Sequence, residues 1–507
     1  MEQDQITSQF RPGQKDALIS ARDAWEESEI GYSHPSFMLK FLARLFRRFF
    51  REFNIFESDT FVHRTEEDRI VASFTAALSF LKDQGIVSAT RRLEDRYNDA
   101  PAFSRFTIEG SYGEGSTDGN RGMRSYGSGF SKDIKTALSK AIGEFLERYF
   151  LTIYHVNDFI RGSCRDMERR GYPFLPPDHF AGFSSRQKEA DPRFRWDHDS
   201  PFFWTRALRI SDKKSVFLPA QFIFWNYRFG DDEPRLINPT TNGSGGMFSM
   251  NKAILAGLYE LIQRDSFLIF WLNGLTPQKI DPRTVPDDDF RTIFEESARY
   301  RFIVHCLNIT TDIAIPSFAV VIEDPGGVPR FSLGGGCDAD PAKALRRALE
   351  EAWDVYYWLR SKEPYSLPER YEPFRMDSLS REERLRLWAN PAMAERFSFL
   401  LSGEEAKFSD VHFEFRPRFG SATKELDYCL GRLSRFGPGY EAYYYPVRNP
   451  IVSRLGYFCV KAIVPQLVPL YLNEAYAPLG ARRIREVPEK IGHHPATAWN
   501  PWPHPFP

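Results

Sequence analysis

A glycine-rich triplet followed by a helical pattern occurs three times in this chain, and it constrains the fold more than any other feature. The triplets are Gly127-Ser128-Gly129, Gly243-Ser244-Gly245 and Gly334-Gly335-Gly336. After the third triplet residue, a small residue follows 8 positions on, another after 4, an acid after 3 and a polar or acidic residue after 3 more. These positions hold Ala137, Ala141, Glu144 and Glu147; Ala253, Gly257, Glu260 and Gln263; Ala344, Ala348, Glu351 and Asp354. One spacing in three copies predicts three equivalent structural units.

Each copy predicts a glycine loop that opens a helix. Ser131, Ser249 and Asp340 stand at N-cap positions, and Pro341 occupies the first helical position of the third copy. The two small residues of a copy lie 4 apart and share one helix face, which permits close packing. The acid and the polar residue lie 3 apart and also share a face.

The predicted helices contain the groups that a nucleotide site without a Walker loop needs, which are phosphate-binding helix N-termini and cation-binding acids. Free N–H groups at a helix N-terminus suit phosphate, whereas the acids, roughly 20 Å further along the helix, suit a hard cation. If the helices converge, Glu144, Glu147, Glu260 and Glu351 lie within about 12 Å of a common point, the span of two hydrated metals and their ligands. The alternative is three ordinary amphipathic helices with solvated acids, which the shared spacing disfavours.

Composition excludes several classes of protein. The 507 residues are 42% hydrophobic, enough for a large core, and the net charge of -1 gives no basic field for nucleic acid. The five cysteines are odd in number and form no C-x-x-C pair, so neither a disulfide framework nor a zinc site is indicated, and a cytoplasmic location is favoured. The sequence shows no signal peptide and no apolar run of 18 residues, so no membrane span is expected.

The pattern divides the chain at about residue 95. Residues 1–95 are expected to form a helical N-terminal region, in which an apolar stripe from Phe37 to Phe53 serves core or dimer packing, or docks into a partner. A second helix is predicted from about Thr65 to Lys82, with Gly85 beyond its end. Residues 96–507 are expected to form a second domain, which carries the predicted nucleotide site.

Further elements follow from local signals. Strands are predicted at 215–227, 302–306, 317–322 and 457–465, and a capping box at Ser380 to Glu383 opens a helix that breaks near Pro391. The chain closes with alternating prolines up to Pro507, which stiffen the tail, interleaved with Trp502 and Phe506. Because these two aromatic residues offer surface to bury, a docked tail is favoured over a frayed one.

The three repeats and this tail together resemble the YcaO family over roughly residues 100–507. Ser125 to Arg148 resembles the first ATP motif of that family, Asn242 to Asp265 the second, and Gly336 to Glu351 the third. The segment from Val464-Pro465 through Leu479-Gly480 to Arg483 is also similar to the family.

The resemblance implies an α/β (α+β) YcaO-type fold, ATP and Mg2+ as cofactors, and ATP-dependent activation of peptide amide bonds. The Pro-x-Pro-x-Pro ending resembles azoline-forming cyclodehydratases, in which Cys, Ser or Thr of a ribosomally made precursor peptide becomes a thiazoline or oxazoline. Thioamide or amidine formation, and a non-catalytic scaffold or regulator, stay open as alternatives.

The resemblance also implies roles for individual residues. The expected metal ligands are Glu144, Glu147, Glu260, Gln263, Glu351 and Asp354; the expected nucleotide contacts are Ser125, Gly127, Gly129, Arg148, Asn242, Gly243 and Arg347; the expected catalytic residues are Pro507, Glu144 and Arg264. Each arginine has an alternative role in an ion pair on a helix surface. Ser128 departs from the lysine common in the family, Gln263 from glutamate and Asp354 from glutamine.

The expected partners are a precursor peptide and a separate protein that binds its leader segment. The roughly 95 N-terminal residues leave no room for the fused leader-binding domain of many azoline formers. The sequence leaves a homo-oligomer open.

Overall fold

The computed structural model describes residues 66–94, 98–112, 124–368, 371–375, 379–411, 413 and 419–506. The expected apolar stripe from Phe37 to Phe53, the expected cap Thr65 and the terminal Pro507 lie outside these residues. The predicted second helix is confirmed as α4 (Glu66–Asp83), and Gly85 follows it with a left-handed φ of 69°.

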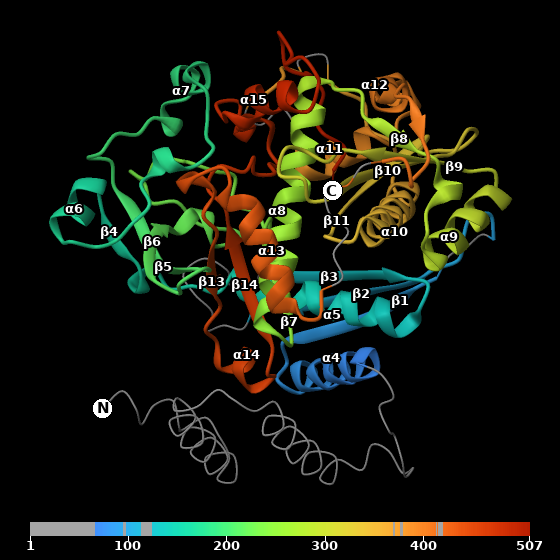
Figure 1. Cartoon of the computed structure of the whole chain (residues 1–507). Helices are drawn as coiled ribbons and strands as arrows, with labels where there is room; N and C mark the ends of the chain where they lie inside the picture. Colours follow the sequence, from blue (N-terminus) through green and yellow to red (C-terminus); the bar gives the residue numbers. More distant parts are fainter. Residues whose placement is uncertain are drawn as a thin grey trace. The chain divides into compact units, whose positions relative to one another are not determined.

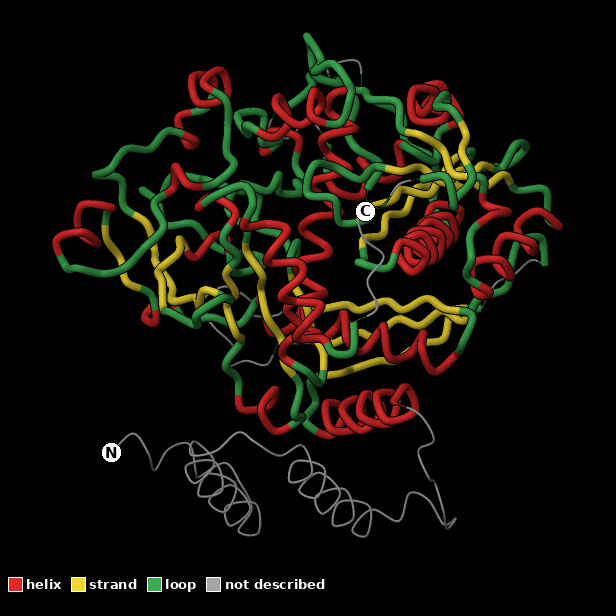
Figure 2. The backbone as a smooth tube through the Cα atoms, viewed as in Figure 1, coloured by secondary structure: helices red, strands yellow, loops and turns green. Residues whose placement is uncertain are grey.

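The described strands form three separate sheets, visible as three groups of strands in Figure 2. The first contains β1 (Val87–Leu93), β2 (Ser104–Ser111) and β3 (Arg124–Ser131) in that order. The second has the order β11 (Phe331–Cys337), β10 (Ser317–Glu323), β9 (Ile303–Asn308), β8 (Gln278–Ile280) and β12 (Glu405–Ala406). The third has the order β4 (Ile160–Gly162), β5 (Phe202–Arg209), β13 (Tyr443–Pro446), β14 (Phe458–Ile463) and β7 (Ser244–Met247), with β6 (Ser215–Pro219) on β5.

Three long helices follow three of these strands directly. They are α5 (Ile134–Leu151), α8 (Met250–Asn273) and α10 (Pro341–Arg360). The shorter helices are α6 (Cys164–Arg169), α7 (Ser185–Ala190), α9 (Asp288–Arg299), α11 (Arg381–Leu387), α12 (Ser398–Leu401), α13 (Ala422–Ser434), α14 (Pro450–Arg454) and α15 (Arg483–Lys490). Helix α8 lies in the middle of the molecule (Figure 1) and is buried at nearly every position from Ala253 onward, as expected for a helix that is apolar on all sides.

The three repeats are confirmed as equivalent units, but their glycines, with the exception of Gly243, lie in strands and not in loops. β3 and β11 carry the first and third triplets whole, whereas β7 begins at Ser244, one residue after Gly243 with its left-handed φ of 87°. Each strand runs straight into the helix of its own copy. A Cβ on Gly129 would overlap the Ala137 carbonyl, one on Gly245 the Ala253 carbonyl, and one on Gly336 the Ala344 carbonyl. The glycines therefore allow the strand backbone to contact the helix backbone. The repeated spacing between these glycines and the small helix residues follows from that contact.

The predicted caps are confirmed in two copies of three. Asp340 caps α10 by accepting from the amides of Ala342 and Lys343, with Pro341 as the first helical residue, and Ser249 stands at the N-cap of α8. Ser131 is not a cap, because β3 continues through it, and Asp133 accepts from the Thr136 amide instead. Asp is as favourable an N-cap residue as Ser, so the cap of α5 can lie two residues later than predicted, at Asp133.

Each glycine strand lies at the edge of its sheet, and the copies contact one another in a cycle. β3, β7 and β11 are all terminal strands. Besides its own strand, α5 packs against β7, α8 against β11 and α10 against β3. Three copies thus close around a common centre, with three open strand edges turned to the helices.

Most other sequence predictions agree with the structure. β9, β10 and β14 cover the strands expected near 302–306, 317–322 and 457–465, and the Ser380 capping box is present at α11. The strand predicted at 215–227 ends at Pro219, where a 3-10 turn begins, because proline cannot continue the ladder. Helix α4 and β1 pack in one core with α5, so this part of the expected N-terminal region belongs to the same body as the repeats.

Alanine at Gly129 should destabilise the protein by roughly 1–3 kcal/mol or more, because the added methyl forces β3 away from α5. Gly431 inside α13 is the matched control, since a Cβ there meets open space. Gly431→Ala should stabilise the fold by about 0.5–1 kcal/mol by removing glycine's unfolded-state entropy. Urea unfolding of the two variants checks the opposite signs, and equal effects would contradict the packing role of Gly129.

Candidate active site

The same hydrogen bond occurs in all three copies, between the glycine strand and the first acid of its helix. The Ser128 amide donates to Glu144, the Gly243 amide to Glu260 at 2.8 Å and the Gly335 amide to Glu351 at 2.6 Å. Ser128 and Gly335 are the middle residues of their triplets and lie on the uncovered edges of β3 and β11, whereas Gly243 is the first residue of its triplet and directly precedes β7. Each acid is thereby fixed in place on the inner side of its unit.

The second polar position of each helix reaches toward the next copy. The Ser244 hydroxyl of the second copy donates to Glu147 of the first at 3.0 Å, and the Gln263 amide of the second lies 3.4 Å from Glu351 of the third. The charge of Glu144 in the first copy contributes to the raised pKa of Asp354 in the third. Polar contacts therefore join the first copy to the second and the second to the third, and electrostatic repulsion acts between the third and the first.

The acids of different copies are close enough to shift one another's ionisation. Burial raises the pKa of Glu147 to about 8, and the charges of Glu260 and Glu144 add to this rise. Burial also raises the pKa of Glu260, although Arg264, the Gly243 amide and Lys461 partly offset it. Burial raises the pKa of Asp354 to about 6. The structure thus brings together acids from all three repeats, as their spacing predicts.

Two predicted arginines join this acid cluster and one does not. Arg148 forms an ion pair of 2.6 Å with Glu144, and Arg264 lies 3.7 Å from Glu260 and 3.5 Å from Glu351. Arg347 is half exposed and pairs with Asp338 at 3.1 Å while donating to the Cys337 carbonyl. All three arginines thus form ion pairs, those of Arg148 and Arg264 with the acid four residues earlier on the same helix. Their roles as nucleotide or catalytic contacts stay predictions.

Several buried polar atoms in and around the acid cluster lack a partner among the described residues. They are Nε and Nη1 of Arg264, Oδ1 of Asn242 and the hydroxyl of Ser125. A buried donor or acceptor without a partner costs about 1–3 kcal/mol, so such atoms point to a missing ligand. Gly127 faces α5 and not open space, because a Cβ there would overlap the Ala141 carbonyl, so it and Gly129 serve packing.

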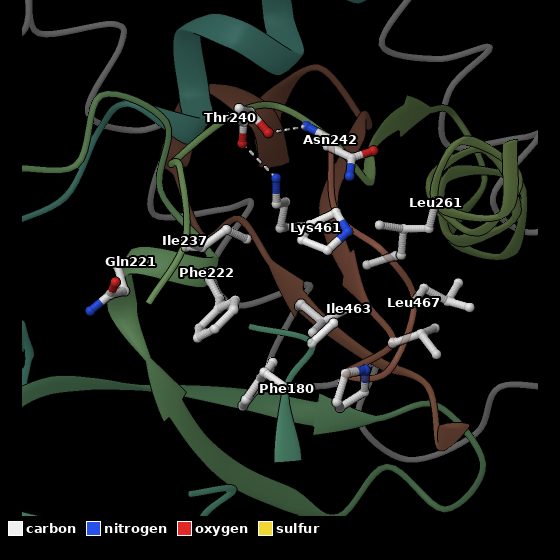
Figure 3. Close-up of a pocket in the computed structure, with 15 residues that line it drawn as sticks. Phe180, Gln221, Phe222, Ile237, Thr240, Asn242, Leu261, Lys461, Ile463 and Leu467 are labelled. Carbon is white, nitrogen blue, oxygen red and sulfur yellow. Dashed lines mark hydrogen bonds between the residues drawn. The ribbon is translucent and has the colours of Figure 1, made fainter. Parts of the chain in front are cut away.

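A lysine that the sequence patterns do not single out lies beside the second repeat. Lys461 on β14 is buried, donates to the Thr240 carbonyl at 2.6 Å, and has a pKa lowered to about 8 by burial, which Glu260 counteracts. Together with Asn242 and Leu261, Lys461 lines a cavity of about 40 Å³ (Figure 3). Leu261 directly follows Glu260 in the sequence. A charged residue inside the predicted buried strand 457–465 is the only sequence signal that marks Lys461.

The proline-rich tail is docked, as predicted for its aromatic residues. Trp271 donates to the Trp502 carbonyl at 3.0 Å, and Tyr371 to the Pro501 carbonyl at 2.8 Å. Nη1 of Arg384 donates to the carbonyls of His504 and Phe506 at 2.6 and 2.7 Å. Phe506 is fully buried, and its ring centroid lies 3.9 Å from Cζ of Arg264. The tail therefore ends against the acid cluster.

These residues fit a metal-bound nucleotide. Buried acids with raised pKa values call for cations, while the unpartnered nitrogens of Arg264 call for an anion. Within the described ranges, no three acidic, histidine or cysteine side chains form a group that holds a metal ion by itself. Glu144, Glu260 and Glu351 are instead tied to strand amides, which fits a metal that arrives with phosphate oxygens as part of its ligand set.

A family model described as YcaO cyclodehydratase, binding ATP and Mg2+, matches residues 128–468. The chain belongs to the YcaO family. The match includes all three repeats and ends before α15 and the tail. ATP and Mg2+ are the cofactors of this family, in agreement with the donor set of the acid cluster.

Solved structures show the same fold. A heterocyclase in complex with substrate and cofactor has a TM-score of 0.67 and 20% identity, covering 86% of this YcaO chain and 57% of that chain. YcaO from Methanopyrus kandleri, bound with AMPPCP and Mg2+, has a TM-score of 0.57 and 16% identity, covering 80% of this chain and 92% of the other. The α/β architecture predicted from the repeats is therefore confirmed as the YcaO fold.

A curated relative is an uncharacterized protein in the tfuA 3′ region of Rhizobium leguminosarum bv. trifolii. It is 31% identical over 163 residues, which are 30% of this YcaO chain and 38% of the relative. The chain thus spans less than half of that relative and little more than half of the heterocyclase. Among the described residues, no helix is long and apolar enough to cross a membrane.

Replacing Glu147 by Gln should stabilise the ligand-free protein in a pH-dependent way. The pKa of Glu147 rises from 4.5 to about 8 on folding, so between these values the folded state holds a proton that the unfolded state releases. Native stability therefore falls as pH rises through this window, and Glu147→Gln escapes that loss. The gain should be near zero at pH 4.5 and roughly 4 kcal/mol at pH 8.

Urea unfolding without nucleotide or metal, at pH 5 and pH 8, measures this gain. Exposed Glu189 on α7 provides the control, and Glu189→Gln should show no comparable dependence on pH. A gain for Glu147→Gln that is equal at both pH values would show that Glu147 is ionised in the ligand-free protein.

Proposed function

We propose that this YcaO protein is an ATP-dependent cyclodehydratase that converts Cys, Ser or Thr residues of a ribosomally made precursor peptide into thiazolines or oxazolines. The observation that carries the proposal is the docked tail. Its last described residue, Phe506, stacks on Arg264 inside the cluster of repeat acids. The family description as a cyclodehydratase supports the same chemistry.

The chemistry needs an amide oxygen to become a leaving group. When bound, ATP with Mg2+ supplies the phosphoryl group that the amide oxygen accepts, and this oxygen leaves as phosphate when the ring forms. The side-chain sulfur or oxygen of the peptide forms the new bond to the amide carbon. The net change in the peptide is the loss of one water per ring.

The residues of the cluster are suited to stabilise the charge that moves in this reaction. We assign metal binding to Glu144, Glu147, Glu260, Gln263, Glu351 and Asp354, and phosphate contact to Arg264 and Arg148. Fixed donors and cations in a site that excludes water stabilise developing phosphate charge without reorganising. Burial of Arg264 and of Glu147's carboxyl supplies such a setting.

The precursor peptide and a leader-binding protein are the partners that we propose. The test incubates the protein with ATP, Mg2+ and a Cys/Ser/Thr-rich precursor, with and without the leader-binding partner. Mass spectrometry should show loss of one water per modified residue, matched by phosphate release, and much faster modification when the partner is present. ATP consumption without any loss of mass from the peptide would reject cyclodehydration.

Glu144→Gln should lower the rate of this reaction by about 10²–10³-fold, because it removes one charge from the charge-stabilising site. The fold should survive, since the glutamine oxygen can still accept from the Ser128 amide. Glu350→Gln on α10, which breaks the ion pair with Lys140 of α5, is the control and should keep near-native turnover. Unchanged turnover in Glu144→Gln would remove this residue from the mechanism.

Extending the chain by a few residues after Pro507 should lower peptide modification by orders of magnitude. We propose that Pro507 presents its carboxylate to the substrate as a general base or positioning group, which requires hydrogen-bond reach. The extension displaces that group but leaves the tail contacts up to Phe506 intact, so nucleotide affinity should stay native. Calorimetry and mass spectrometry on the extended and native proteins provide the comparison, and near-native modification would limit the tail to packing.

A further inference from the structure

Phe506 occupies a socket built from three parts of the chain. Its ring packs edge-on against Phe267 of α8, with centroids 4.6 Å apart, and covers the guanidinium of Arg264 at 3.9 Å. A Cβ on Gly335 of β11 would overlap the ring, so the glycine strand of the third repeat leaves room for this side chain of the tail. The ring is fully buried.

The backbone of the tail is clamped at the same place by a buried arginine. Arg384 of α11 has no exposed surface and binds the carbonyls on both sides of Pro505. His504 contacts Arg384 through Nδ1 at 3.0 Å, and its Nε2 donates to the Tyr471 carbonyl at 2.6 Å. The position of the Phe506 ring is therefore fixed by hydrogen bonds to the tail backbone as well as by apolar contacts of the ring.

The stacking of Phe506 on Arg264 leaves the N–H donors of this guanidinium able to bind an anion. An aromatic ring attracts a guanidinium through its face, whereas the N–H donors of the guanidinium point outward in its plane. Nε and Nη1 of Arg264 are buried without partners, and Nη2 lies a long 3.5 Å from Glu351 and 3.7 Å from Glu260. The ring thus holds the plane of the guanidinium while its in-plane donors stay available.

We propose that Phe506 is a positioning residue for nucleotide binding. It acts through Arg264, whose guanidinium it orients toward the phosphates of the nucleotide. The tail then has two separable tasks: its penultimate side chain completes the nucleotide site, and any role of the terminal carboxylate concerns the peptide. This inference rests on the nucleotide site of the proposed function but not on azoline formation.

The test is binding of a non-hydrolysable ATP analogue with Mg2+, measured by calorimetry on the whole protein. Phe506→Leu keeps an apolar side chain in the socket but removes the aromatic face, so affinity should fall by about 2- to 30-fold. Trp502→Leu is the matched control, because Trp502 also stacks on an arginine, Arg396, at 4.3 Å but does not contact Arg264. Its affinity should stay native.

A double-mutant cycle with Arg264→Met shows whether Phe506 acts through Arg264. In that background, Phe506→Leu should have no further effect on affinity, a result that general loosening of the tail would not give. Additive losses, equal losses in Phe506→Leu and Trp502→Leu, or native affinity in Phe506→Leu would each overturn the proposal. If the native protein binds no nucleotide, the proposed function itself fails. Matching thermal midpoints for Phe506→Leu and the native protein confirm that the fold is intact.

Discussion

The structure depends on one hydrogen bond made three times, from a backbone amide of each glycine triplet to an acid on the following helix. A free strand edge exposes N–H groups that must find a partner or remain in water. Here the partners are Glu144, Glu260 and Glu351, and the glycines bring strand and helix close enough for the bond to form. The same contact that finishes each sheet therefore orients the acids toward the centre.

Placing these acids together has an energetic consequence. Glu147, Glu260 and Asp354 have raised pKa values because burial and neighbouring acids disfavour their charged forms. The pKa of Asp265 in the core is also raised by burial, although two hydrogen bonds from Arg483, of 2.8 and 2.7 Å, partly offset this rise. In the acid cluster, ion pairs with Arg148 and Arg264 and hydrogen bonds from backbone amides compensate the acids only in part. Cations that bind there would stabilise the folded state further, which couples folding to ligand binding.

The sequence contained the spacing of the units but not their contacts. The offsets predicted three helices with Glu144, Glu260 and Glu351 in equivalent places, because helical periodicity is local. The triplets suggested loops, since glycine-rich runs usually form turns, and only packing against the helix carbonyls explains their place in strands. Arg384 and Lys461 carry no local pattern. Their roles come from contacts to residues more than 100 positions away, Phe506 and Thr240.

The clamp on the tail also has a consequence for the order in which the protein matures. Arg264 and Arg384 are synthesised long before Phe506. The ring of Phe506 nevertheless covers Arg264, and the carbonyl of Phe506 accepts a hydrogen bond from Arg384. During translation, the three repeats therefore emerge before the segment that carries Phe506. The contact between Phe506 and Arg264 therefore joins two segments that leave the ribosome at very different times, and it forms only after the tail has been synthesised.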